Sequence, residues 1–315
     1  MNIRPNPIVV VGSINMDFVV TAPRIPVTGE TLTGSEFQTH FGGKGANQAM
    51  AVARLGYPVE MLGRVGTDVF GPQIRNVLHN AGVGISAVEV VGGSSGVASI
   101  TVSDSGENAI VVVPGANGQV SPEFVDRHEK TIRNAGLVLA QLEVPMETIV
   151  HLAELCRRHQ IPLILDPAPA QELPQDVFRS IDWLTPNQTE ASVYSGRVIS
   201  DGDEHAPQLA AASILAKGCR GVVLKMGSRG AYVASRDGVA AFIPAFTVDV
   251  VDTTGAGDAF NGGFATALML GKSPAESAVF AAAVAAISVT RAGAQGSMPS
   301  MEEVDCFLEN APMPG

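Results

Sequence analysis

The stretch Val251-Asp252-Thr253-Thr254-Gly255-Ala256-Gly257-Asp258-Ala259-Phe260-Asn261-Gly262-Gly263 joins a glycine-rich turn to a segment with helical spacing of apolar residues. The residues at this spacing are Phe260, Phe264, Ala267 and Leu268. They predict a helix with Asp258 in its first turn. The first N–H groups of a helix have no partner within it, and glycine has no Cβ to keep an anion away. We therefore expect the N–H groups of Gly255, Ala256 and Gly257 to form an anion site, assisted by the helix dipole.

An aspartate beside such an anion site indicates phosphoryl transfer. Asp258 could orient a substrate hydroxyl and accept its proton while the backbone amides stabilise charge on the transferred group. A weak carboxylate base suffices, because the transition state of this reaction is usually loose. The alternative for so short a motif is a plain loop and helix cap.

Composition limits the class of protein. The chain has 315 residues, of which 46% are hydrophobic, so it can bury one large core. The net charge of −11 disfavours nucleic acid as a partner, but not ATP, whose phosphates can be held by backbone amides and Mg²⁺. Three widely spaced cysteines favour a reduced, cytoplasmic protein. The longest nearly apolar run, 278–289, is too short to cross a membrane.

The order of the expected elements indicates an α/β fold. Short apolar runs at 8–11, 137–140 and 163–166 read as buried strands, and helical patterns occupy 121–136 and 146–159. Strands separated by helices predict right-handed crossovers and a parallel sheet. The runs 95–102 and 109–113 predict an antiparallel pair of strands across a polar turn.

Polar side chains follow the buried strands. Asn15 and Asp17 come after the first strand, and Glu143 follows the strand at 137–140. The carboxyl ends of strands are where open α/β sheets bind ligands, so these groups could bind the hydroxyls of a small polar substrate. An Asx turn and a solvated loop carboxylate are the alternatives. In the segment 42–48, the glycines let the backbone approach a ligand closely, and Lys44 and Asn47 add hydrogen-bond donors.

Two further segments carry candidate functional groups. Asn187 and Glu190 could supply oxygen ligands, directly or through water, to an Mg²⁺ held by phosphates. A capped helix start at the same place is the alternative. Ser273 and Glu276 predict a capping box that opens an alanine-rich helix to about residue 289.

The two glycine-containing motifs resemble those of the ribokinase family, the phosphofructokinase-B type of sugar kinases. One is Asp-Thr-x-Gly-Ala-Gly-Asp-x-Phe at 252–260, and the other combines Gly-Ser-Ile-Asn-Met-Asp at 12–17 with Phe-Gly-Gly-Lys-Gly-Ala-Asn-Gln at 41–48. The resemblance extends from Ile8 to about Leu308. It implies one domain over 1–315, with a three-layer α/β/α fold, a mainly parallel central sheet, and a small β-sheet lid from segments near 16–41 and 95–114.

The resemblance also implies an activity. This is ATP-dependent phosphorylation of D-ribose at O5 to give D-ribose 5-phosphate, with Asp258 as the base. A 2-deoxyribose, fructose or nucleoside kinase of the same family is the alternative, and a sugar-sensing protein without turnover is a third possibility. An oxidoreductase is disfavoured, because no GxGxxG follows the first strand.

The family's site residues transfer to matching positions of this sequence. The sugar-binding residues are Asn15, Asp17, Gly43, Lys44, Asn47, Glu143 and Asp258. The nucleotide-binding residues are Asn187, Lys225, Gly227, Ser228, Gly230, Gly257 and Ala282. Glu190 is expected to act on Mg²⁺ through water. Lys225 replaces the small hydroxyl residue expected there, so its role toward the nucleotide is open.

The last implied site binds a monovalent cation such as K⁺ as an activator. Its oxygens are expected from Asp252, Thr254, Ser288, Arg291, Gly293 and Ser297, and a turn without metal is the alternative. The resemblance further implies a homodimer formed through the lid. Neither nucleic acid nor a membrane is expected as a partner.

Overall fold

The computed structural model describes residues 5–200, 203 and 205–310. Within them, a nine-stranded sheet has the order β13-β12-β11-β10-β9-β8-β1-β4-β5. Its strands are β1 (Ile8–Val11), β4 (Val59–Gly66), β5 (Gly84–Val91), β8 (Leu137–Gln141), β9 (Leu163–Asp166), β10 (Trp183–Leu184), β11 (Gly221–Lys225), β12 (Ala231–Ser235) and β13 (Ala240–Ile243). All pairings from β5 to β11 are parallel, and β12 and β13 add an antiparallel edge. The mainly parallel sheet predicted from the sequence is confirmed.

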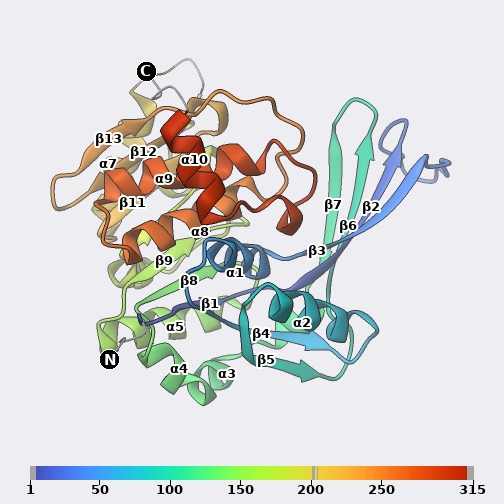
Figure 1. Ribbon diagram of the computed structural model, residues 1–315, viewed down its shortest axis with the longest axis horizontal. Helices are drawn as coiled ribbons and strands as arrows, with labels where there is room; N and C mark the ends of the chain where they lie inside the picture. The colour runs from blue at the N-terminus through green and yellow to red at the C-terminus, as the bar shows by residue number, and fades with distance from the viewer. Residues whose placement is uncertain (1–4, 201–202, 204, 311–315) are drawn as a thin grey trace.

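Helices cover both faces of this sheet (Figure 1). One face carries α1 (Lys44–Arg54), α2 (Phe70–Asn80), α8 (Ala256–Met269), α9 (Pro274–Ser288) and α10 (Met301–Asn310). The other carries α3 (Pro122–Arg127), α4 (Glu129–Arg133), α5 (Met146–His159), α6 (Gln188–Ser195) and α7 (Ala206–Lys217). Strand β1 shows why: Ile8 and Val10 pack into the first core, whereas Val9 and Val11 pack into the second. The result is the predicted three-layer α/β/α arrangement.

A second sheet, four-stranded within the described residues, projects from this body (Figure 1). Its order is β3 (Glu36–Gly42), β2 (Asn15–Ala22), β6 (Gly96–Ser103) and β7 (Asn108–Val113). The predicted antiparallel pair at 95–113 is present as β6 and β7. At the base of this sheet Asn15 is paired with both Gly42 and Gly96, just beyond the carboxyl end of β1.

Some boundaries differ from those predicted. The helix expected over 121–136 is divided into α3 and α4 at His128, whose φ of −104° and bond to the carbonyl of Val125 tighten the chain into a 3₁₀-type turn. Strand β3 begins at Glu36, within the segment near 16–41 that was expected to contribute to the lid.

Other local signals hold. The capping box of Ser273 and Glu276 opens α9, which contains most of the apolar run at 278–289. Short 3₁₀ helices occupy η1 (Gly115–Gln119), η2 (Gln175–Ser180), η3 (Gly227–Arg229) and η4 (Gln295–Ser297). No helix in the described part of the chain is long and apolar enough to cross a membrane.

Candidate active site

Asp258 lies in the first turn of α8, as predicted, and is 6% exposed. Its two carboxylate oxygens accept hydrogen bonds of 2.9 Å from Asn47 Nδ2 and Gln48 Nε2, both on α1. Burial raises the pKa of Asp258, Lys44 lowers it and Asp166 raises it, with a net rise. The carboxylate is therefore held in one orientation between two helices and has an increased affinity for a proton.

The turn before Asp258 exposes backbone donors. Gly255 has a φ of 76°, and a Cβ on it would lie 2.9 Å from Ala294 Cβ, so glycine is required here. No described residue accepts a hydrogen bond from the N–H groups of Gly255 or Gly257. The third predicted donor, Ala256, already donates to Thr253 O at 3.2 Å. Two of the three N–H groups are thus free for an anion at the positive end of α8.

Asp17 and Asn47 present unsatisfied acceptors near Asp258. Among the described residues, Asp17 Oδ1 and Asn47 Oδ1 are buried without a hydrogen-bond partner. Burial raises the pKa of Asp17 to about 7, with further contributions from the charges of Glu143 and Asp258. A buried acceptor without a donor costs about 1–3 kcal/mol. Hydroxyl groups of a ligand fit these two atoms, because each hydroxyl can donate one hydrogen bond.

Asn15 is positioned by Asn117, a residue that the sequence analysis missed. Asn117 Nδ2 donates to Asn15 Oδ1 at 2.7 Å, and Asn117 Oδ1 accepts from the N–H of Ile14 at 2.9 Å. Gly96 leaves room for this pair, since a Cβ there would lie 2.2 Å from both side chains. Asn117 lies in η1, about a hundred residues from Asn15, and nothing in its local sequence indicates this contact.

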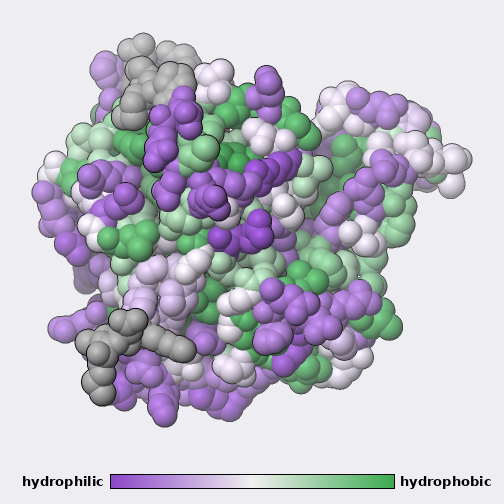
Figure 2. Space-filling view, in the orientation of Figure 1, coloured by the Kyte–Doolittle hydropathy of each residue, from purple (hydrophilic) through white to green (hydrophobic). Residues whose placement is uncertain are grey.

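Glu143 joins the end of β8 to the start of α1. Its Oε2 accepts from Ser13 Oγ at 2.5 Å and from the N–H of Lys44 at 3.3 Å. Burial lowers the pKa of Lys44, but the carboxylates of Asp258, Asp166, Glu143 and Glu190 raise it more, so Lys44 stays charged. Asn15 and Glu143 line a cavity of about 390 Å³ to which β7 contributes Val112. The space-filling view shows the projecting sheet standing apart from the main body (Figure 2).

Asn187 and Glu190 form a capping box at the start of α6. Asn187 N and Nδ2 donate to the two oxygens of Glu190 at 2.7 and 2.9 Å, and Asn187 Oδ1 accepts from the N–H of Glu190. The cap that the sequence left as an alternative is therefore present. No group of three or more His, Cys, Asp or Glu in the described part of the chain could hold a metal. Mg²⁺ fits here only if phosphate and water oxygens complete its coordination.

The turn after β11 contains both exposed residues and a glycine that the fold requires. Gly227 and Ser228 are exposed, whereas Gly230 is needed by the fold, because a Cβ on it would lie 2.0 Å from Ile243 O. Lys225 Nζ lies 3.1 Å from Asp166 Oδ1 and 3.6 Å from where a Cβ on Gly257 would be. Ala282 is buried in the core on α9. Lys225 therefore lies beside the predicted anion site.

Among the residues predicted to bind a cation, Asp252 contacts Thr254 and Gly293. Its carboxylate accepts from Thr254 N and Oγ1 at 2.9 and 2.7 Å and from Gly293 N at 2.8 Å. These bonds lower the pKa of Asp252 although burial opposes them, so the carboxylate is ionised. The hydroxyls of Ser288 and Ser297 donate to the backbone oxygens of Ala285 and Ala294.

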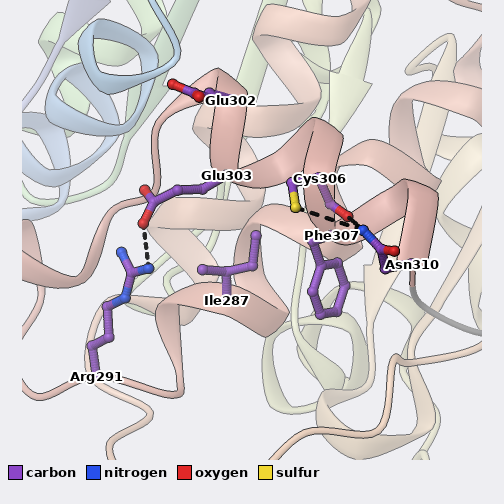
Figure 3. Close-up of a pocket in the computed structure, with 7 residues that line it drawn as sticks. All are labelled: Ile287, Arg291, Glu302, Glu303, Cys306, Phe307 and Asn310. Atoms are coloured by element: carbon purple, nitrogen blue, oxygen red, sulfur yellow. Dashed lines mark hydrogen bonds and ion pairs between the residues drawn. The ribbon is translucent and has the colours of Figure 1, made fainter.

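Arg291 can offer a cation only its backbone oxygen. Its guanidinium is directed at Glu303 on α10, with 2.5 Å between Nη2 and Oε1 (Figure 3). This ion pair lies at the surface, beside Ile287 and Phe307. It joins the segment after α9 to the last helix, α10.

Comparisons with known proteins agree with this architecture. The model of the pfkB family of carbohydrate kinases matches residues 6–301. The chain belongs to the pfkB family. It is 42% identical over 303 residues to the ribokinase of Bacillus subtilis, covering 96% of this chain and 99% of that protein. It is 39% identical over 303 residues to the deoxyribokinase of Salmonella typhi, covering 96% and 98%.

The pfkB fold is also seen in a solved relative. The structure of Arabidopsis thaliana ribokinase complexed with ribose and ATP matches with a TM-score of 0.89 and 37% identity, covering 97% of this chain and 99% of that chain. The resemblance inferred from the two motifs is confirmed. Within this pfkB chain, Gln48 and Asp166 are further residues of the site that the sequence analysis did not assign.

Proposed function

We propose that this protein catalyses the ATP-dependent phosphorylation of D-ribose at O5 to give D-ribose 5-phosphate. The observation that carries the proposal is the buried Asp258 carboxylate, fixed by Asn47 and Gln48 beside two free N–H groups. The ribokinase relatives, one of them complexed with ribose and ATP, support this substrate pair.

The side chains divide the work between binding and proton transfer. Asn15, Asp17 and Glu143 would accept hydrogen bonds from sugar hydroxyls, with Gly43, Lys44 and Asn47 closing the same pocket. Asp258 would orient the reacting hydroxyl and accept its proton as the O–P bond forms. The N–H groups of Gly255 and Gly257, with Ala256, would stabilise negative charge on the transferred phosphoryl group.

The charge of the site explains why a divalent cation is expected with the nucleotide. Electrostatic interactions connect Lys44 and Lys225 with the carboxylates of Asp17, Glu143, Asp166, Glu190 and Asp258. Even with Asp17 protonated, four carboxylates against two ammonium groups would repel a free polyphosphate. Mg²⁺ on the phosphates would neutralise that charge, with Glu190 acting through water and Asn187, Lys225, Gly227, Ser228, Gly230 and Ala282 on the nucleotide side.

A monovalent cation such as K⁺ would stabilise the anion site without contacting the substrates or taking part in phosphoryl transfer. Its oxygens would come from Asp252 and Thr254 together with Ser288, Arg291, Gly293 and Ser297. The same loop packs on the anion site, because Ala294 lies against Gly255. Ordering of the loop by a cation would thereby fix the turn that carries the free N–H groups.

The experiment that tests the function is steady-state ADP release with Mg²⁺ and ATP. D-ribose, 2-deoxyribose, fructose and a nucleoside are compared, each with K⁺ and without it. We expect the highest kcat/KM for ribose and a rise with K⁺. The deoxyribokinase relative gives a precedent for 2-deoxyribose. A preference for that sugar would change the proposed substrate but leave the proposed role of Asp258 as the base unchanged. Sugar-dependent thermal stabilisation without ADP release would instead indicate a sugar-sensing protein.

We further propose a single cytoplasmic catalytic domain whose small sheet serves as a lid and as a homodimer contact. Strand β7 supports this, because its Ile110, Val111, Val112 and Val113 are each 46–65% exposed. Such a row of apolar side chains on a sheet edge favours pairing with another chain.

The dimer is tested by Val111→Asp. A charge in an apolar contact is strongly unfavourable, so we expect sedimentation to show a shift from dimer to monomer. Val193→Asp is the control, since Val193 is 51% exposed on α6, away from the small sheet. A mass that does not change with Val111→Asp, or a wild-type monomer, would contradict the proposal.

A further inference from the structure

Lys225 and Asp166 form an ion pair at the carboxyl ends of β11 and β9. Their side chains are 13% and 3% exposed, and 3.1 Å separates Nζ from Oδ1. Removing two charges from water is costly, and an apolar pair of similar volume often serves the fold as well or better. The presence of this pair beside the anion site therefore calls for a chemical explanation.

The ammonium of Lys225 is directed at the start of α8. It lies 3.6 Å from the place where a Cβ on Gly257 would be, next to a free N–H group. A backbone bridge between Lys225 and Asn187 also places the end of β11 beside the start of α6. From this position a lysine can reach a phosphoryl group held by the backbone donors.

Asp166 is in turn linked to the base. Its Oδ2 accepts from Gln48 Nε2 at 3.0 Å, and the same nitrogen donates to Asp258 Oδ1 at 2.9 Å. Gln141 Nε2 donates to Gln48 Oε1 at 2.6 Å, which fixes the orientation of the Gln48 amide. One amide group thus sets the positions of the carboxylate that holds Lys225 and of the carboxylate that would accept the proton.

We propose that Lys225 is a catalytic residue that contacts the terminal phosphoryl group during transfer, and that Asp166 is the positioning residue that holds its ammonium beside the start of α8. This inference rests on the proposed kinase function. Lysine stabilises the charge on the transferred oxygens and takes no part in proton transfer, which is left to Asp258. Asp166 acts only through Lys225.

The test compares four variants, Lys225→Met, Lys225→Arg, Asp166→Asn and the double variant Lys225→Met/Asp166→Asn. Lys130→Met is the control, because Lys130 is an exposed residue of α4. Lys225→Met is expected to lower kcat by about 10²-fold, with little change in the KM for sugar. Asp166→Asn is expected to lower kcat by about 10-fold but to have no further effect when Lys225 is already Met, because the two residues act as one unit. Lys225→Arg should restore part of the rate.

Calorimetry with Mg²⁺–ATP and Mg²⁺–ADP gives a second readout that does not need turnover. Lys225→Met should weaken ATP binding by about tenfold, with a much smaller effect on ADP, since the lost contact is to the terminal phosphoryl group. Equal weakening of both nucleotides, a kcat within about threefold of wild type, or additive effects of the two substitutions would overturn the inference. The double variant removes both charges. If it folds and has the same defect as Lys225→Met, that defect does not come from a buried Asp166 carboxylate left without a partner.

A wild-type protein that binds ATP but phosphorylates none of the sugars would count against the proposed function. The comparison of ATP with ADP would then still decide the role of Lys225.

Discussion

Asp258→Asn is expected to lower kcat by about 10²–10⁴-fold, the range for loss of a general base, with sugar binding unchanged. The substitution keeps the shape of the side chain but removes its capacity to accept a proton. One of the donors from Asn47 or Gln48 would then face an amide N–H₂ group, so some loss of thermal stability is also expected.

The measurement is kcat from ADP release together with the Kd of the sugar from calorimetry. Asp249→Asn is the matched control, because Asp249 is exposed and close in sequence but outside the site. If Asp258→Asn retained most of its kcat while binding sugar normally, Asp258 would not be the base.

Asp17→Asn is expected to weaken sugar binding by about 10- to 100-fold, corresponding to the loss of a hydrogen bond to a charged group. The wild-type affinity should also rise with pH. Sugar hydroxyls donate to the ionised carboxylate, whereas burial raises the pKa of Asp17 in the free protein to about 7. Sugar binding near neutral pH should therefore release a proton, and affinity should fall as the pH is lowered through 7.

The same shift affects folding in the opposite direction. Between the usual value of 3.8 and about 7, the folded protein holds a proton on Asp17 that the unfolded chain does not. The free energy of unfolding therefore declines as pH rises through this window, and Asp17→Asn should remove that decline. The binding effect is measured by calorimetric titration from about pH 5.5 to about 8.5. Asp104→Asn, in the exposed turn between β6 and β7, is the control. A sugar affinity as pH-dependent in Asp17→Asn as in wild type would show that another group titrates.

Features that depend on residues close together in the sequence could be predicted without the structure. Gly255 and Gly257 precede Asp258 by three residues and one residue, and helix periodicity alone places the carboxylate in the first turn of α8. The alternating short strands and helices likewise determined the mainly parallel sheet. These features follow from local rules, namely side-chain period and the unpaired N–H groups at a helix start.

The partners of these residues could not be predicted in this way. Asn117 reaches Asn15 across 102 positions, and Gln48 reaches Asp258 across 210. Capping statistics could not decide between a metal ligand and a cap at Asn187 and Glu190, and the structure shows that both oxygens of Glu190 accept bonds from Asn187.

By itself, the sequence determined the fold class and placed Asp258 in the first turn of a helix behind a glycine-rich turn, because these features depend on neighbouring residues and on period. Only the tertiary structure decided that Asp166 pairs with Lys225 and that Gln48 links this pair to Asp258. Asp166 and Lys225 end two different strands, and Gln48 lies on a helix far from both in sequence. Their contact depends on the order of strands in the sheet and on the packing of α1 against α8, which no local pattern of residues encodes.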